Sequence, residues 1–191
     1  MIQTWLHTAE KVSTSLPNGR RLFQAYAALL NFAWQNDWTG ACHDSSAALY
    51  MILSEMGFSP SIVIGEVNAA AGTFDHSWVE LDGEIFDVAV GFPGEEGNYV
   101  GPSVFASLNL NTGETTELVY GVRSSSGLDD VGLFVAASNL EQYSAVQPVG
   151  FTIWDITPYV GAACGVKLQK SDLYRKYGKV TRIVRGQETS V

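Results

Sequence analysis

Apolar residues recur every three or four positions in three stretches near the start of the chain, which is the spacing of one buried helix face. The stretches cover residues 2–12, 20–35 and 42–56. Gly57 can adopt the left-handed conformation that ends a helix, and the proline that follows prevents the third helix from continuing. The pattern therefore predicts three amphipathic helices.

After residue 60 the apolar residues alternate with polar ones, which is the pattern of a half-buried β-strand. Strands are predicted over 61–67, 76–81 and 84–90. Asp82 and Gly83 separate the last two strands and favour the two-residue turn that closes a β-hairpin. Because successive residues of a strand point to opposite faces, this hairpin determines which side chains share a face of the sheet.

The second half of the chain gives weaker patterns. Candidate strands lie at 104–110, 116–122 and 179–184. Two apolar runs, 131–138 and 149–157, are too short to be assigned to helix or strand. Ser171 is expected to cap a short helix that runs through Tyr177.

Helices first and strands later indicate the α+β class, with N-terminal helices packed on an antiparallel sheet. The 191 residues, 46% of them hydrophobic, fit one domain that spans residues 1–191. No apolar run reaches the roughly 18 residues of a membrane span, and the first residues lack the order of a signal peptide. We therefore expect a cytoplasmic protein without a membrane partner.

The charge is negative overall and unevenly distributed. Eleven basic residues stand against 20 acidic ones, and this net charge of −9 argues against a nucleic-acid partner. Most of the basic residues follow Gly165, where only Asp172 and Glu188 oppose them, so that segment carries about +5. We expect this basic tail to pack on the acidic remainder of the chain.

Cys42 stands where a polar stretch gives way to the third helix. The free N–H groups and the dipole of a helix N-terminus lower the pKa of a cysteine there and supply donors for an oxyanion. Ser45 and Ser46 follow Cys42 at the spacing of one helix face, and their small side chains leave room for a substrate. Two cysteines are too few for a disulfide framework. The other one, Cys164, is expected to be a structural core residue, as free cysteines usually are.

A thiolate needs a base, and the chain has three histidines. His7 lies in the first helix without polar neighbours and is expected at the surface. His43 adjoins Cys42, but neighbouring helix positions point about 100° apart, so it is expected to be a poor partner for the sulfur. His76, on the predicted strand over 76–81, is the candidate base.

The predicted hairpin register brings Asp87 near His76. With a two-residue turn, Trp78 pairs with Asp87, which then lies diagonally across from His76 on the same face at about 7–8 Å between backbones. A slip of one residue would place them on opposite faces. Cys42, His76 and Asp87 then form a nucleophile, a base and an orienting acid.

Two other interpretations of these residues stay open. In the first, each has an ordinary structural role: Cys42 as a small core residue, His76 as a hydrogen-bonded strand residue and Asp87 as a polar residue of an edge strand. In the second, Cys42, His43, His76 and Asp87 form a zinc site, although no paired ligand spacing such as C-x2-C supports it.

The segments "GACHDSSAALYMILSEMGFSPSIVIGEV" and "FDHSWVELDGEIFDVAV" resemble the core of the transglutaminase-like superfamily of papain-fold cysteine enzymes, in the form of its small bacterial members. The shared pattern is a G-x-C helix start, a strand, an H-x-W-V-E strand and a strand bearing Asp. The resemblance implies Cys42 as nucleophile, His76 as base and Asp87 as third member, within a core of about residues 36–90. Residues 91–191 would then be a β-rich completion of the sheet or an accessory lobe.

The resemblance implies a thiol-dependent hydrolase of peptide or glutamine amide bonds, which forms a thioester acyl-enzyme and uses no cofactor or metal. A transglutaminase that uses an amine acceptor, or a catalytically silent binding module of the same fold, are the alternatives. A redox or metal-binding thiol protein would be favoured if Cys164 lay beside Cys42. The expected partner is a peptide or protein substrate, and the oligomeric state is left open.

The resemblance also suggests where an oxyanion donor and a cleft would lie. Asn36 and Trp38 are the candidate donors, because papain-like enzymes carry a glutamine shortly before the cysteine. Ser45 and Trp78 are candidate cleft residues. The usual apolar or aromatic residue near the nucleophile is replaced here by His43 and the acidic residue that follows it.

A glycine-rich loop, "GFPGEEGNYVGPS", comes directly after the strand that carries Asp87. Its position suits a wall or lid of the substrate cleft. Its two acidic residues, Glu95 and Glu96, are expected to disfavour acidic substrates.

Overall fold

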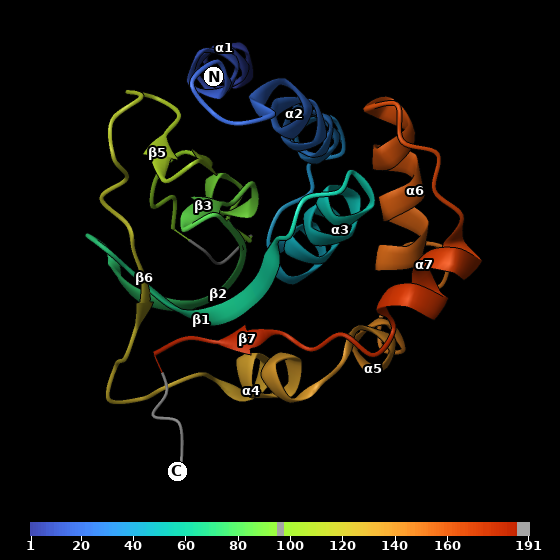
Figure 1. Cartoon of the computed structure of the whole chain (residues 1–191). Coiled ribbons are helices and arrows are strands. Elements are labelled where there is room, and N and C mark those ends of the chain that lie inside the picture. The colour runs from blue at the N-terminus through green and yellow to red at the C-terminus, as the bar shows by residue number, and fades with distance from the viewer. Residues whose placement is uncertain (95–97, 187–191) are drawn as a thin grey trace.

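The computed structural model of the protein describes residues 1–94 and 98–186. The first three helices are α1 (Ile2–Ser13), α2 (Gly19–Gln35) and α3 (Cys42–Glu55), which confirms the three helices predicted from the apolar spacing. Figure 1 shows α1 and α2 together at one end of the molecule, with α3 between α2 and the sheet. Gly57 has a φ of 84°, the left-handed conformation expected at the end of α3.

One curled sheet has the strand order β3-β2-β1-β6, with β7 also paired to β1. Its strands are β1 (Ser61–Ala69), β2 (Gly72–Leu81), β3 (Glu84–Phe86), β6 (Val119–Val122) and β7 (Ile183–Val184). Neighbouring strands are antiparallel except β7, which runs parallel to β1. Figure 1 shows β1 and β2 curving beneath α3, so the architecture is mixed α and β, as predicted.

Two predicted strands are interrupted. The strand expected over 84–90 stops at Phe86, and the chain then turns into the 3₁₀ helix η1 (Ala89–Gly91). The strand expected over 104–110 is a tight hairpin of β4 (Val104–Phe105) and β5 (Leu108–Asn109). Ala106 and Ser107 make this turn with φ values of 50° and 60°. The sequence does not predict this conformation, because neither residue is glycine or asparagine.

The segment after β6 is more helical than the β-rich segment expected from the sequence. The two unassigned apolar runs form α4 (Asp130–Ala137) and α6 (Ile153–Ala163), and α5 (Leu140–Ser144) lies between them. The last helix, α7 (Lys170–Tyr177), begins before Ser171 and has Gln169 at its N-cap, so the predicted serine cap is wrong. Of the strand expected over 179–184, only β7 forms.

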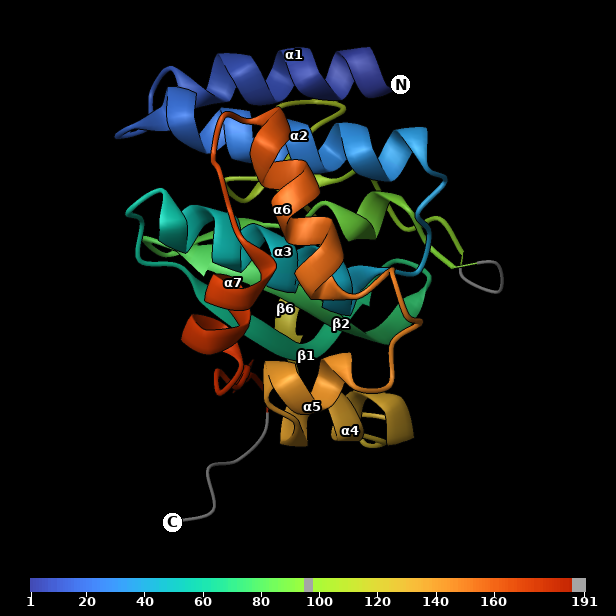
Figure 2. The ribbon, with the colours of Figure 1, turned by 90° about the vertical axis from the view of Figure 1, so that its right-hand side faces the viewer.

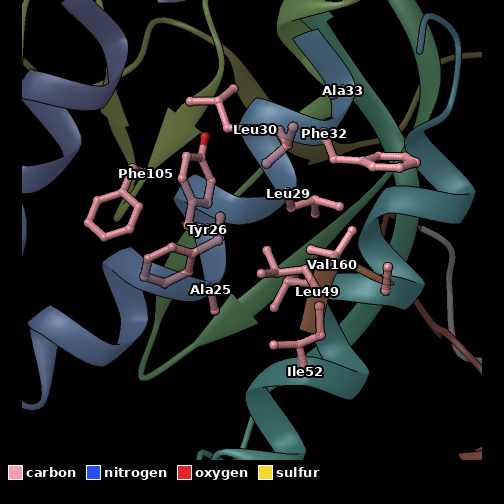
Figure 3. Packing of buried hydrophobic residues seen from close by; sticks show 14 of the residues in the cluster. Ala25, Tyr26, Leu29, Leu30, Phe32, Ala33, Leu49, Ile52, Phe105 and Val160 are labelled. Carbon is pink, nitrogen blue, oxygen red and sulfur yellow. The ribbon is translucent and has the colours of Figure 1, made fainter. Parts of the chain in front are cut away.

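The main core lies where α2, α3 and α6 meet, as Figure 2 shows from the side. The inward face of α2 is fully or almost fully buried, with the residues Ala25, Tyr26, Leu29, Leu30, Phe32 and Ala33. Figure 3 shows Leu49 and Ile52 of α3 and Val160 of α6 packed against this face. Each fully buried leucine or isoleucine contributes about 1.5–3 kcal/mol, so this contact holds α3 firmly at its place above the sheet.

Basic residues near the C-terminus form ion pairs with acidic residues from earlier elements, which confirms the expected packing of the tail. The pairs and their N–O distances are Lys170–Asp155 (2.6 Å), Lys176–Glu55 (2.8 Å), Lys179–Glu141 (2.6 Å) and Arg185–Glu80 (2.7 Å). Exposed pairs of this kind are worth about 0–1 kcal/mol each, so they orient the tail more than they stabilise it.

Candidate active site

Cys42 is the first residue of α3 and is half-buried. The first helical hydrogen bond runs from the Ser45 amide to the Ala41 carbonyl oxygen (2.8 Å). The amides of residues 42–44 therefore precede the hydrogen bonds of the helix. Gly40 has a φ of 64°, and a Cβ there would lie 3.3 Å from the Gly94 Cα. Glycine thus lets the chain turn sharply into α3 beside the glycine-rich loop.

His76 of β2 donates from Nε2 to Oδ2 of Asp87 at 2.7 Å, and both side chains are buried. The hairpin pairs Val79 with Phe86, which is the predicted register, although the ladder ends there and the expected pair of Trp78 with Asp87 is not part of it. The expectation that His76 and Asp87 share a face is confirmed. Since Nε2 is committed to Asp87, Nδ1 is the ring nitrogen left for the sulfur. The protein therefore fixes both the orientation and the tautomer of this imidazole.

Asp87 is held by more groups than the sequence suggested. It lies beyond the end of β3 and pairs with Val104 in an isolated bridge. Its Oδ1 accepts from the Val90 amide at 3.1 Å, and its Oδ2 also accepts from the Tyr120 hydroxyl at 2.8 Å. Nothing in the sequence pointed to Tyr120, because the pairing of β6 with β1 is not encoded in any local pattern. These donors hold the buried carboxylate in place beside His76.

The electrostatics of the site favour a thiolate and an imidazolium. Burial by itself raises the pKa of the Cys42 thiol, but the charges of His43 and His76 and their hydrogen bonds outweigh it and hold this pKa well below its usual value. Burial lowers the pKa of His76, but Asp87 and the Cys42 thiolate raise it to about 10. Between these two pKa values, Cys42 is an anion and His76 a cation.

Cys42 and His76 open into one cavity of about 370 Å³. Its other lining residues are mostly small or apolar, namely Gly40, Ala71, Gly72, Thr73, Phe74, Asp75, Ala89, Val90, Phe92, Pro93, Gly94, Asn98 and Val100. The described part of the glycine-rich loop therefore walls the cavity, as the sequence suggested. Glu95 and Glu96 lie outside the described residues.

The other cleft and oxyanion candidates lie away from this cavity. Asn36 is exposed at the end of α2 and donates from Nδ2 to the Phe32 carbonyl oxygen at 2.8 Å, which is a helix-capping role. The Trp38 ring packs edge-on against Phe32. Ser45 and Trp78 are 3% and 1% exposed and pack inside the protein, so the space expected beside Ser45 is filled.

The expectation that His43 is a poor partner for the sulfur is wrong. Its Nδ1 lies 3.7 Å from the Cys42 Sγ and 2.8 Å from the Ser77 hydroxyl. The angle of about 100° between neighbouring helix positions applies to the directions of their Cβ atoms. The Nδ1 atom of His43 lies close to its own backbone, and both side chains pack inward against β2, so this nitrogen reaches the sulfur. His7, in contrast, is exposed on α1, as expected.

A polar network holds the first turn of α3 from the opposite side of the site. The Asp44 carboxylate accepts from the Tyr143 hydroxyl and from Nε2 of Gln147 (2.6 Å). The Arg182 side chain is 4% exposed, lies 4.7 Å above the Tyr143 ring and donates from Nη2 to the His43 carbonyl oxygen at 3.0 Å. The sequence gave no sign of these contacts, since their members lie about a hundred residues or more from α3.

The second cysteine and the metal alternative do not join this site. Cys164 is a free, half-buried thiol that donates to the Gly161 carbonyl oxygen and lines a groove between α2 and α6, not the Cys42 cavity. Burial raises the pKa of its thiol. Within residues 1–94 and 98–186, no group of three or more histidine, cysteine or acidic side chains is arranged to hold a metal ion.

No protein-family model, curated protein or solved structure matches the chain. Across the described ranges, no helix has both the length and the apolar character needed to cross a bilayer.

Proposed function

We propose that this protein is a thiol-dependent hydrolase that acts on peptide or glutamine amide bonds through Cys42, His76 and Asp87. The observation that carries the proposal is the 2.7 Å hydrogen bond from His76 to Asp87, beside a cavity into which Cys42 opens at a helix N-terminus. A nucleophile, a base and a group that orients the base are the three parts that such catalysis needs.

In the proposed reaction, the Cys42 thiolate attacks the carbonyl carbon of the amide. The amides at the start of α3 are the donors for the developing oxyanion. The imidazolium of His76 gives its Nδ1 proton to the leaving nitrogen, the C–N bond breaks and a thioester forms. Neutral His76 then takes a proton from water, whose oxygen attacks the thioester and releases the acid and the thiolate.

The arrangement of elements supports the resemblance to the transglutaminase-like superfamily. A helix that begins with the candidate nucleophile packs on an antiparallel sheet whose hairpin carries the histidine, with the aspartate directly after its second strand. Both cysteines are free thiols, and a catalytic thiol has to stay reduced, so we also propose a cytoplasmic location.

The test is a mixture of peptides that contains internal glutamines, incubated with the protein and analysed by mass spectrometry. The proposal expects new peptide termini or deamidated glutamines, both lost in Cys42→Ser and retained in Cys164→Ser. A primary amine added to the mixture separates hydrolysis from acyl transfer, since its incorporation would mark the protein as a transglutaminase. Equal product in the unmodified protein and in Cys42→Ser would refute the proposal.

A further inference from the structure

The Cys42 sulfur interacts with two imidazoles that are held in different ways. His76 is tied through Nε2 to Asp87 at 2.7 Å and has only Nδ1 left. The Nδ1 atom of His43 lies 3.7 Å from Sγ and 2.8 Å from the hydroxyl of Ser77. The amide chemistry proposed above uses only His76, so His43 contacts the reacting atom without a role in that chemistry.

Ser77 suits an imidazole that changes its protonation state. Its hydroxyl can donate a hydrogen bond to an unprotonated Nδ1 and can accept one from a protonated Nδ1. The side chain is 1% exposed and follows His76 directly in β2, so it is fixed by the same strand. The His43 ring therefore keeps a hydrogen-bond partner at Nδ1 whether or not that nitrogen carries a proton.

Several elements surround His43. The Tyr143 ring of α5 lies edge-on to the imidazole, with 6.2 Å between ring centroids, and Arg182 binds the His43 carbonyl oxygen. The titratable and charged groups around His43 and the sulfur that it contacts are Cys42, Asp44, His76, Tyr143 and Arg182. Packing from α5 and from the segment before β7 thus keeps the ring at the sulfur.

We propose that His43 is a second proton acceptor for the Cys42 thiol. In this step the S–H bond breaks, the proton binds Nδ1 of His43 and the electron pair stays on sulfur. The inference rests on the proposed function, because it assigns a further role within the same site. His43 maintains the thiolate of the free protein, and His76 supplies the proton that the leaving nitrogen needs.

The test follows thiolate absorbance near 240 nm against pH in a Cys164→Ser background, where Cys42 is the only thiol. His43→Asn keeps an amide near the Nδ1 position but cannot take up the proton. We expect this change to move the Cys42 titration upward by about one pKa unit, a tenfold smaller thiolate fraction at low pH. Combined with His76→Asn, it should bring the pKa of the thiol to the ordinary value of about 8.5 or above it, because burial alone raises this pKa.

Two controls keep the outcomes distinct. His7→Asn, on the surface of α1, should leave the titration unchanged. Ser77→Ala keeps the imidazole but removes its hydroxyl, and a smaller upward shift is expected; this variant decides the matter if His43→Asn does not fold. If the pKa of Cys42 is unchanged in both His43→Asn and Ser77→Ala, the proposed role of His43 is wrong, whereas the proposed function still stands. An ordinary thiol pKa in the parent protein overturns the proposed function as well.

Discussion

The Nε2 atom of His76 and the Oδ2 atom of Asp87 lie 2.7 Å apart, although eleven positions separate the two residues along the chain. The turn between their strands makes this contact possible. Asp82 and Gly83 have φ values of 53° and 84°, as a two-residue hairpin turn requires. The carboxylate that results raises the pKa of His76, so the turn affects the chemistry of the site as well as the fold.

Asp87→Asn tests this link because it keeps a hydrogen-bonding oxygen and removes the charge. We expect kcat/KM near neutral pH to fall by about 10²–10⁴-fold, the usual range for such a change. The alkaline limb of the pH–rate profile, set by His76 at about 10, should move to lower pH, since the imidazolium exists only below its pKa. An alkaline limb that stays in place would show that Asp87 does not control His76.

Tyr120→Phe removes the hydroxyl that donates to Asp87 at 2.8 Å while it keeps the ring that packs on Trp78. We expect a loss of about 1 kcal/mol in the free energy of unfolding, the usual contribution of one hydrogen bond. Urea unfolding of the two proteins measures the difference. No change in stability would mean that this hydrogen bond is replaced by another partner.

Cys42→Ser tests whether the sulfur carries a negative charge. The Cys42 thiolate is one of the groups that raise the pKa of His76 to about 10, so its loss should lower this pKa. Asp87 stays in place and should keep it above the ordinary value of about 6.5. An NMR titration of the His76 ring measures the shift, and a pKa that remains at about 10 would indicate that Cys42 is a neutral thiol.

Arg182→Met tests the influence of the buried guanidinium on the thiol. Arg182 interacts electrostatically with Cys42, and we expect its loss to slow alkylation of Cys42 near pH 6 several-fold. Its Nε and Nη1 make no hydrogen bond within the described residues, so the free energy of unfolding should change by only about 1–2 kcal/mol.

Arg185→Met is the matched control for that experiment, because Arg185 follows in the same segment but forms an exposed pair with Glu80. It should leave the alkylation rate unchanged. Equal rates of Cys42 alkylation in the two arginine variants would show that Arg182 does not influence the thiol.

The parts of the site that depend on local patterns could be predicted from the sequence. The start of α3 at Cys42 follows from apolar spacing, and the position of Asp87 relative to His76 follows from one hairpin turn. Both arguments span few residues, and steric rules fix their geometry. The contact of His43 with the sulfur does not follow from such a rule, because Cβ directions do not determine where a ring nitrogen lies.

The remaining contacts come from pairings between distant segments, and no local pattern encodes them. Tyr120 reaches Asp87 because β6 pairs with β1, and Arg182 reaches His43 because β7 pairs with the same strand. The hairpin at Ala106 and Ser107 was missed for another reason: tertiary packing holds two residues there in a conformation usually left to glycine or asparagine.

The reactivity of the Cys42 thiol is measured most directly by alkylation of the protein with iodoacetamide from about pH 5 to 9, with Cys42 and Cys164 followed separately by peptide mass spectrometry. We expect Cys42 to react rapidly near pH 6 and more slowly in His76→Ala and Asp87→Ala, whereas Cys164, whose pKa is raised by burial, should stay unreactive. A Cys42 that reacts no faster than an ordinary thiol and ignores both substitutions would contradict this expectation.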